Sequence, residues 1–182
     1  SVHFDGSFAG WRREARRLLH AGIDPAALSW RTDDDAGQLF GDPFTEAPNA
    51  APAPLRIPRE LPELLESASR YRADDRWALL YRVLWRVAQG DRSAMLAGDR
   101  DGSDLQRRVK SVRREAHHLH AFVRFQPCKA AGAPDFVAWF EPGHHILRAE
   151  AGFFRRRFAA LRWSILTPSG SAHWEGPESG EV

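Results

Sequence analysis

The sequence predicts an α+β fold in which a helical layer packs on an antiparallel sheet within a single domain. Two observations support this class. Apolar residues recur at helical spacing through most of residues 59–120, and from residue 121 to residue 174 they alternate with a period of two. The length of 182 residues suits one domain of ordinary size. A hydrophobic share of 43% and a charged share of 27% exclude a wholly disordered chain.

The first 31 residues are predicted to form a strand–helix–strand unit of this domain. Ser7 is a candidate N-cap of the helix, and Gly22 is expected to end it. Short strands are expected near residues 2–4 and 28–30, with one of them added to the edge of the sheet. Residues 32–58 are rich in proline, alanine and aspartate and show little apolar periodicity, which predicts a surface linker.

The main α+β domain is expected over residues 59–176 and begins with helices. Two helices are predicted over residues 60–71 and from about residue 74 to residue 90. The helix at residues 103–119 has the clearest pattern, because its aliphatic residues recur at spacings of three and four. Its polar side chains must therefore face away from the buried stripe.

The second part of this domain is predicted to be mostly strands. Residues 121–126 and 136–141 are expected to form an antiparallel pair, and residues 162–167 and 171–174 a second hairpin. A short helix is expected over residues 151–160. Residues 177–182 are expected to be a tail leading into a further, C-terminal domain. The predicted core includes Trp11, Leu84, Val109, Val112, Ala116, Phe125 and Ile165.

Cysteine content limits the cofactors that this chain can hold. Cys128 is the only cysteine, so an internal disulfide, a four-cysteine iron–sulfur cluster and a zinc ribbon are excluded. No cofactor is expected, with a divalent metal ion as the alternative. No apolar run approaches the ~20 residues that span a bilayer, and no signal peptide opens the sequence, so we expect a cytoplasmic protein without a membrane partner.

Basic residues are concentrated in one part of the sequence. Residues 103–165 contain 12 Lys or Arg against 5 Asp or Glu, a net charge of +7, although the whole chain carries only +2. One hypothesis is that these residues bind the phosphate backbone of DNA, with Phe153, Trp163 or Trp174 as stacking faces. The alternative is an ordinary solvated helix face. The candidate nucleic-acid-binding residues are Arg107, Lys110, Arg113, Arg114, Arg124, Arg155, Arg156 and Arg157.

Histidine and glutamate form a second set of candidates near residues 113–120 and 141–145. One hypothesis is an acid–base centre, because imidazole beside carboxylate is the usual apparatus of proton transfer. Another is a metal site built from His117, His120 and His144. The third is structural, with ion pairs and helix caps only. The candidate catalytic residues are Glu115, His117, Glu141 and His144.

Several segments in order resemble a bacterial domain of unassigned function. They are FDGSF at residues 4–8, VRREAH at 112–117, AFVRF at 121–125, WFEPGH at 139–144, FFRRRF at 153–158 and WSILTP at 163–168. That domain occurs in proteins of DNA metabolism and as the N-terminal half of long UdgX-type uracil-DNA-binding glycosylases. The resemblance implies a DNA-repair context, with DNA and a uracil-DNA glycosylase domain as partners, but it implies no reaction for the domain itself.

Three functions are therefore carried forward as hypotheses. The first is an accessory DNA-binding domain of a uracil-DNA glycosylase-type protein, without the catalytic glycosylase half. The second is an enzyme centred on histidine and glutamate, with or without metal, that acts on nucleic acid or an adduct. The third is a protein-interaction module that docks a repair partner.

Overall fold

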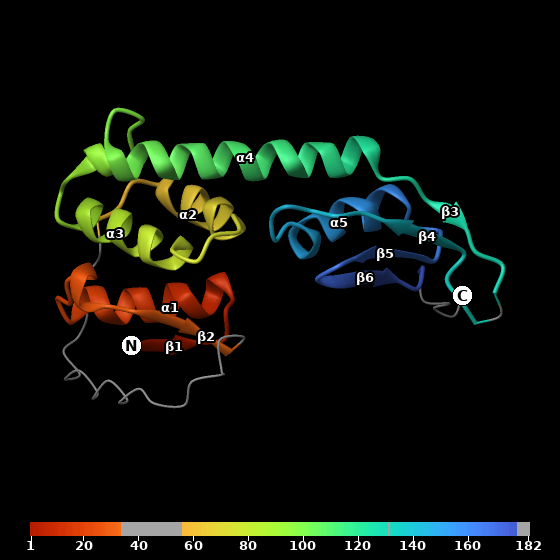
Figure 1. Cartoon of the computed structure of the whole chain (residues 1–182), viewed down its shortest axis with the longest axis horizontal. Coiled ribbons are helices and arrows are strands. Elements are labelled where there is room, and N and C mark those ends of the chain that lie inside the picture. The colour runs from red at the N-terminus through yellow and green to blue at the C-terminus, as the bar shows by residue number, and fades with distance from the viewer. Residues whose placement is uncertain (34–55, 131, 178–182) are drawn as a thin grey trace. The chain divides into compact units, whose positions relative to one another are not determined.

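The computed structural model describes residues 1–33, 56–130 and 132–177 and has the predicted α+β class (Figure 1). The chain divides into two compact units, Ser1–Val109 and Lys110–Val182. Most of the expected linker and of the expected tail, residues 34–55 and 178–182, lies outside the described residues. Within the described residues, every helix is too short or too polar to cross a membrane.

The N-terminal strand–helix–strand prediction is confirmed by β1 (Val2–Phe4), α1 (Phe8–His20) and β2 (Trp30–Thr32). The Ser7 hydroxyl caps α1, accepting a hydrogen bond from the Gly10 N–H at 2.9 Å. β1 and β2 pair in parallel and form a two-stranded sheet of their own. The prediction that one of these strands joins the edge of the larger sheet is therefore wrong. The two strands on either side of α1 pair with each other instead.

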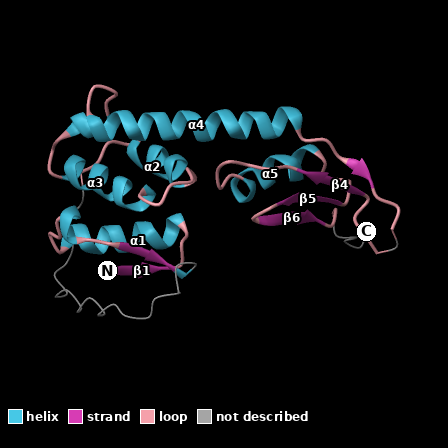
Figure 2. Cartoon of the chain, in the orientation of Figure 1, coloured by secondary structure: helices cyan, strands magenta, loops and turns pink. Residues whose placement is uncertain are grey.

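Helices α2 (Leu61–Ser69) and α3 (Arg76–Ala88) complete the first unit with the short 3₁₀ helices η1 (Pro25–Ala27) and η3 (Arg92–Met95) (Figure 2). Aromatic rings pack against one another within its largely aliphatic core. The ring of Trp77 lies edge-on to Phe4, with centroids 5.1 Å apart, and is stacked on Trp11 at 6.1 Å. The buried Tyr81 hydroxyl donates to the Ile23 carbonyl at 2.8 Å, so its polar end is satisfied.

Helix α4 (Arg100–Phe122) is longer at both ends than the expected helix over residues 103–119. Its 23 residues span about 35 Å. The helix begins at Arg100 because the Asp99 carboxylate accepts hydrogen bonds from the N–H groups of Asp101 (2.9 Å) and Gly102 (3.1 Å). An aspartate at this position also interacts favourably with the positive end of the helix dipole.

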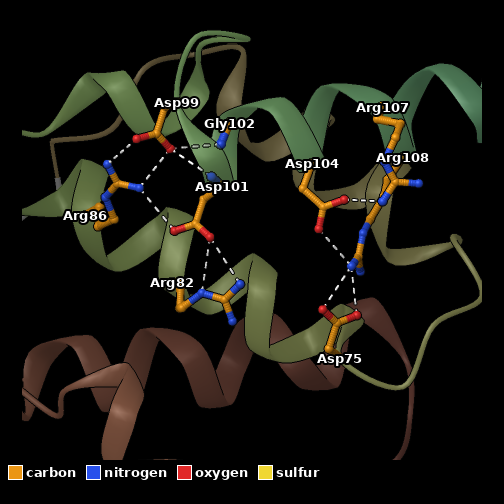
Figure 3. Close-up of polar contacts among 9 residues, drawn as sticks. All are labelled: Asp75, Arg82, Arg86, Asp99, Asp101, Gly102, Asp104, Arg107 and Arg108. Carbon is orange, nitrogen blue, oxygen red and sulfur yellow. Dashed lines mark hydrogen bonds and ion pairs between the residues drawn. The ribbon is translucent and has the colours of Figure 1, made fainter.

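A network of arginines and aspartates joins α3 to the start of α4 (Figure 3). The Arg86 guanidinium binds both oxygens of Asp99, at 2.8 and 2.9 Å, and reaches Asp101 at 3.1 Å. Arg82 also binds Asp101. The Arg86 guanidinium holds the pKa of the Asp99 carboxyl well below its usual range, and the Gly102 N–H acts in the same direction. The network therefore stabilises the first turn of α4 against α3.

The strand expected over residues 121–126 is wrong except at Gln126, because α4 continues to Phe122 and residues 123–125 form a connection without regular structure. His120 packs against α5 (Leu147–Arg157), where its ring is stacked on Phe153 at 3.8 Å. This contact requires the helical position of residue 120. Only Gln126 and Pro127 remain as strand β3. The apolar run near residue 122 fits both the helical period of 3.6 residues and the strand period of two.

The second unit contains a four-stranded sheet in the order β3–β4–β5–β6. Its longer strands are β4 (Phe136–Trp139), β5 (Trp163–Thr167) and β6 (Gly170–Trp174). The predicted β3–β4 and β5–β6 antiparallel pairs are confirmed. The prediction of a purely antiparallel sheet is wrong, because β4 and β5 run parallel. Helix α5 joins these two strands, and a crossover helix returns the chain in the same direction.

Most of the predicted core is buried as expected. Trp11, Leu84, Val109, Val112 and Ile165 are all buried. Ala116 and Phe125 are only half-buried. Phe125 lies in the connection between α4 and β3, where its ring contacts Phe154 and Phe158 edge-on.

Replacement of Gly102 by alanine is expected to destabilise the protein by about 1–3 kcal/mol. A Cβ at residue 102 would lie 2.1 Å from the Leu96 carbonyl oxygen, which is backbone and cannot rotate away. Gly98→Ala is the matched control, because a Cβ there meets nothing within 4 Å. Urea unfolding should find Gly98→Ala neutral or stabilising by up to about 1 kcal/mol. Equal effects of the two substitutions would contradict this packing.

Acid should weaken the wild-type protein more than the Asp99→Asn variant. The ionised Asp99 carboxylate stabilises the fold above its unfolded pKa of about 3.9, and this contribution is lost as the pH falls below that value towards the lowered folded pKa. Urea unfolding between about pH 5 and about pH 2 measures the difference. The exposed Asp74→Asn variant is the control and should follow wild type. Parallel curves for wild type and Asp99→Asn would refute the assigned role.

Candidate nucleic-acid interface

One side of α4 in the second unit is exposed and basic. We call it the basic face and define it by Lys110, Arg113, Arg114, His117 and His118, all of which are exposed. These positions lie opposite the buried Val112 and Leu119, since residues three and four apart share one side of a helix. The burial of the aliphatic stripe therefore turns the cations outward.

Two cations of the basic face, Lys110 and Arg114, are not neutralised within the described residues. Lys110 and Arg114 make no ion pair or hydrogen bond with any residue in the described part of the chain. The one acid of this part of α4, Glu115, accepts hydrogen bonds from another segment of the second unit. A ligand of opposite charge would thus meet cations without displacing an internal partner.

Two other predicted DNA-binding arginines have internal partners. Arg107, in the first unit, pairs with Asp104 and donates to the Tyr71 hydroxyl at 3.1 Å. The Arg124 guanidinium donates to the carbonyls of Ala121 (3.0 Å) and Val123 (3.2 Å), and so satisfies acceptors at the C-terminal end of α4. Both side chains are engaged in holding the fold.

The three consecutive arginines predicted to bind DNA lie in the last turn of α5 and are exposed. The Arg155 guanidinium lies 5.7 Å from the ring centre of Trp174, and that of Arg157 lies 5.5 Å from the ring centre of Phe158. Arg156 is exposed on the same turn. Cations at this end of a helix interact favourably with its dipole, which gives the three arginines a structural role as well.

The predicted Glu/His centre is brought together in part. Glu115 Oε1 accepts from the Gly143 N–H at 2.6 Å, and Oε2 accepts from the His144 N–H at 2.8 Å. His144 Nε2 lies 2.8 Å from the Ser111 hydroxyl, one turn before Glu115 on the same side of α4. These contacts anchor the loop that leads into α5. The carboxylate faces backbone N–H groups here, and the imidazole faces a hydroxyl.

The other two predicted catalytic residues have different surroundings. Glu141 accepts a hydrogen bond from the Trp139 indole N–H at 3.0 Å. His117 is exposed on the basic face and makes no polar contact within the described residues. The described contacts therefore join Glu115 to the backbone of His144 and leave Glu141 and His117 outside that cluster. The enzymatic function stays a prediction.

The alternative metal site named His117, His120 and His144. His120 Nε2 lies 2.9 Å from Glu150 Oε2, while His144 faces Ser111. Across residues 1–33, 56–130 and 132–177, no group of three or more His, Cys, Asp or Glu side chains is arranged to hold a metal ion. The three histidines thus have separate surroundings within the second unit.

Each of the three aromatic residues suggested as stacking faces for a base is buried or in contact with another side chain. Trp163 is only 2% exposed, Phe153 is stacked on His120, and Trp174 lies beneath Arg155. The exposed aromatic residues of the second unit are Phe122 (61%) and Trp139 (57%). Trp139 is exposed because its side of β4 is opposite to that of the buried Ala138.

Phe122 was missed because its segment was expected to be a strand. It lies four residues after His118 and eight after Arg114, so the helical spacing was already readable in the sequence.

The second unit is an α+β domain whose clearest surface feature is an exposed basic helix. The chain matches the family described as a domain of unknown function (DUF4130) over residues 74–175, more than half of its length, and belongs to that family. Searches of curated proteins and of solved structures found no match.

Replacement of Glu115 by alanine is expected to cost about 1.5–3 kcal/mol of stability, because two backbone N–H groups lose a charged acceptor. The N–H groups of Gly143 and His144 should also exchange faster with deuterium, which NMR can measure. Glu66→Ala removes a surface i,i+4 ion pair with Arg70 and is the control, with a cost within about 0.5 kcal/mol. Unchanged exchange at both N–H groups would rule out the anchoring role.

Proposed function

We propose that this protein is a DNA-binding accessory domain that contacts the phosphate backbone through the basic face of α4. One observation carries the proposal: Lys110 and Arg114 lie one turn apart on an exposed surface and have no internal partner within the described residues. Arginine and lysine on an exposed helix are the usual donors to nucleic-acid phosphates, and their charge supplies most of the sequence-independent affinity.

The distribution of charge along the sequence supports a polyanionic ligand. Residues 103–165 carry an excess of +7, and within them the Glu115 carboxylate of α4 accepts from the N–H groups of Gly143 and His144. In the described residues from Lys110 to Phe122, the exposed positions of α4 contain no Asp or Glu. Phosphates approaching this side would therefore meet attraction without a competing carboxylate on the same surface.

The particular system proposed is uracil-DNA repair in the cytoplasm. Support comes from the resemblance of segments such as VRREAH and FFRRRF to the accessory half of UdgX-type glycosylases. The family match covers residues 74–175 and adds no activity. In this proposal the domain holds DNA, and a glycosylase domain that is attached or separate performs the chemistry.

The double substitution Lys110→Ala with Arg114→Ala is expected to lower DNA affinity about tenfold or more at low salt. It should also reduce the slope of log affinity against log salt by about 2, since each phosphate contact contributes about 1. Fluorescence anisotropy with a labelled oligonucleotide at several salt concentrations gives both values.

The matched control is Arg12→Ala with Arg16→Ala on α1. It removes the same charge at the same i,i+4 spacing from two exposed positions of the first unit. This control is expected to keep the wild-type salt slope. Equal losses in the two double variants would mean that net charge alone drives binding, and no binding by wild type at low salt would overturn the proposal.

A further inference from the structure

We infer that Phe122 is a stacking platform for an unpaired nucleobase, so that the DNA bound along the basic face is single-stranded. This inference rests on the proposed DNA-binding function and adds the strandedness and the residue that reads it. The ligand is a single strand whose phosphates lie along Lys110 and Arg114 while one base packs on the Phe122 ring. Each of these residues belongs to the second unit.

The first argument is the position of Phe122 relative to the cations. Lys110, Arg114, His118 and Phe122 follow one another at intervals of four residues on α4. Each interval advances about 6 Å along the helix axis, so the line extends over about 18 Å. Each interval also turns about 40° around the axis, so the row winds around α4 and ends at the Phe122 ring.

The second argument is the local environment of the ring. Phe122 is 61% exposed at the last residue of α4. Its ring meets the His118 ring at a centroid distance of 5.2 Å and an angle of 83°. This edge-to-face contact restrains the Phe122 side chain. A restrained aromatic ring loses little conformational entropy when a base stacks on it.

Phe122 differs in its surroundings from Trp139, which is also a large exposed aromatic residue in the described part of this unit. Trp139 is 57% exposed, but its indole N–H is bound to the Glu141 carboxylate. A carboxylate beside the ring repels phosphate. Phe122 instead has the cationic Arg114 two turns before it, and the ring beside it is a histidine rather than a carboxylate. Charge complementarity therefore selects Phe122 as the platform.

Single strands are favoured over duplex because of what an aromatic side chain can reach. In a duplex both faces of each base are covered by neighbouring pairs, whereas in a single strand a base can leave the stack and pack on a protein ring. Basic side chains contact phosphates in both forms. Phe122 should accordingly distinguish the two forms, while Lys110 and Arg114 should not.

The test measures the affinities of wild type, Phe122→Leu and Phe122→Tyr for a single-stranded oligothymidine and for a duplex of equal length at fixed low salt. We expect wild type to prefer the single strand. Phe122→Leu should lose roughly 5- to 100-fold in single-strand affinity, the range of base–aromatic stacking, with duplex affinity within about twofold of wild type. Phe122→Tyr keeps an aromatic ring and should retain single-strand binding.

Trp139→Leu is the matched control and should leave both affinities unchanged. If wild type binds neither DNA, the proposed function fails, and the inference fails with it. If wild type binds DNA but Phe122→Leu equals wild type on the single strand, the inference alone is overturned. The same holds if Phe122→Tyr loses affinity as Phe122→Leu does, or if the loss appears in Trp139→Leu instead.

Discussion

The need to bury one aliphatic stripe of α4 determines the orientation of its exposed basic residues. Leu105, Val109, Val112 and Leu119 are all buried. Lys110 and Arg114 lie away from this stripe and are exposed, because residues three and four apart share one side of a helix. By contrast, Arg108 is buried and is paired with Asp75 and Asp104. The exposed basic face thus follows from apolar packing.

Charge is used in two different ways along this helix. At its start, arginines and aspartates neutralise one another, and Asp99 serves at once as the partner of Arg86 and as the helix cap. From Lys110 to Phe122 the helix contains a single acidic residue, Glu115, and its carboxylate anchors the loop before α5. The first arrangement contributes stability to the fold, and the second leaves cations exposed to solvent. Arginine count alone would treat the two alike.

The candidate catalytic residues illustrate how a polar cluster can have a structural explanation. Glu115 and His144 are neighbours, but the carboxylate is occupied by two backbone N–H groups. Loop backbone that leads into a helix has donors without intrahelical partners, and a carboxylate from a neighbouring helix satisfies them. The two residues meet because the loop has to be held, and no proton transfer between them is needed to explain their contact.

The sequence by itself determined the elements whose periodicity is long and regular. The helices, the β5–β6 hairpin with its turn, and five of the seven predicted core residues followed from local pattern, because burial of one side of an element repeats along the chain. The candidate basic residues on α4 were also identified this way. The direction of β4 relative to β5 was predicted wrongly, because an antiparallel sheet was expected although a helix between two strands permits a parallel pair.

Only the tertiary structure decided which charges have partners and where α4 ends. Asp99 and Arg86 are 13 residues apart, and Glu115 is 28 residues from Gly143, so neither contact has a local signature. Residues 121 and 122 fit a helix or a strand equally well, and in the structure they continue α4. The exposure of Phe122 and Trp139 likewise depends on which side of each element its neighbours cover, and that is a property of the assembled layers.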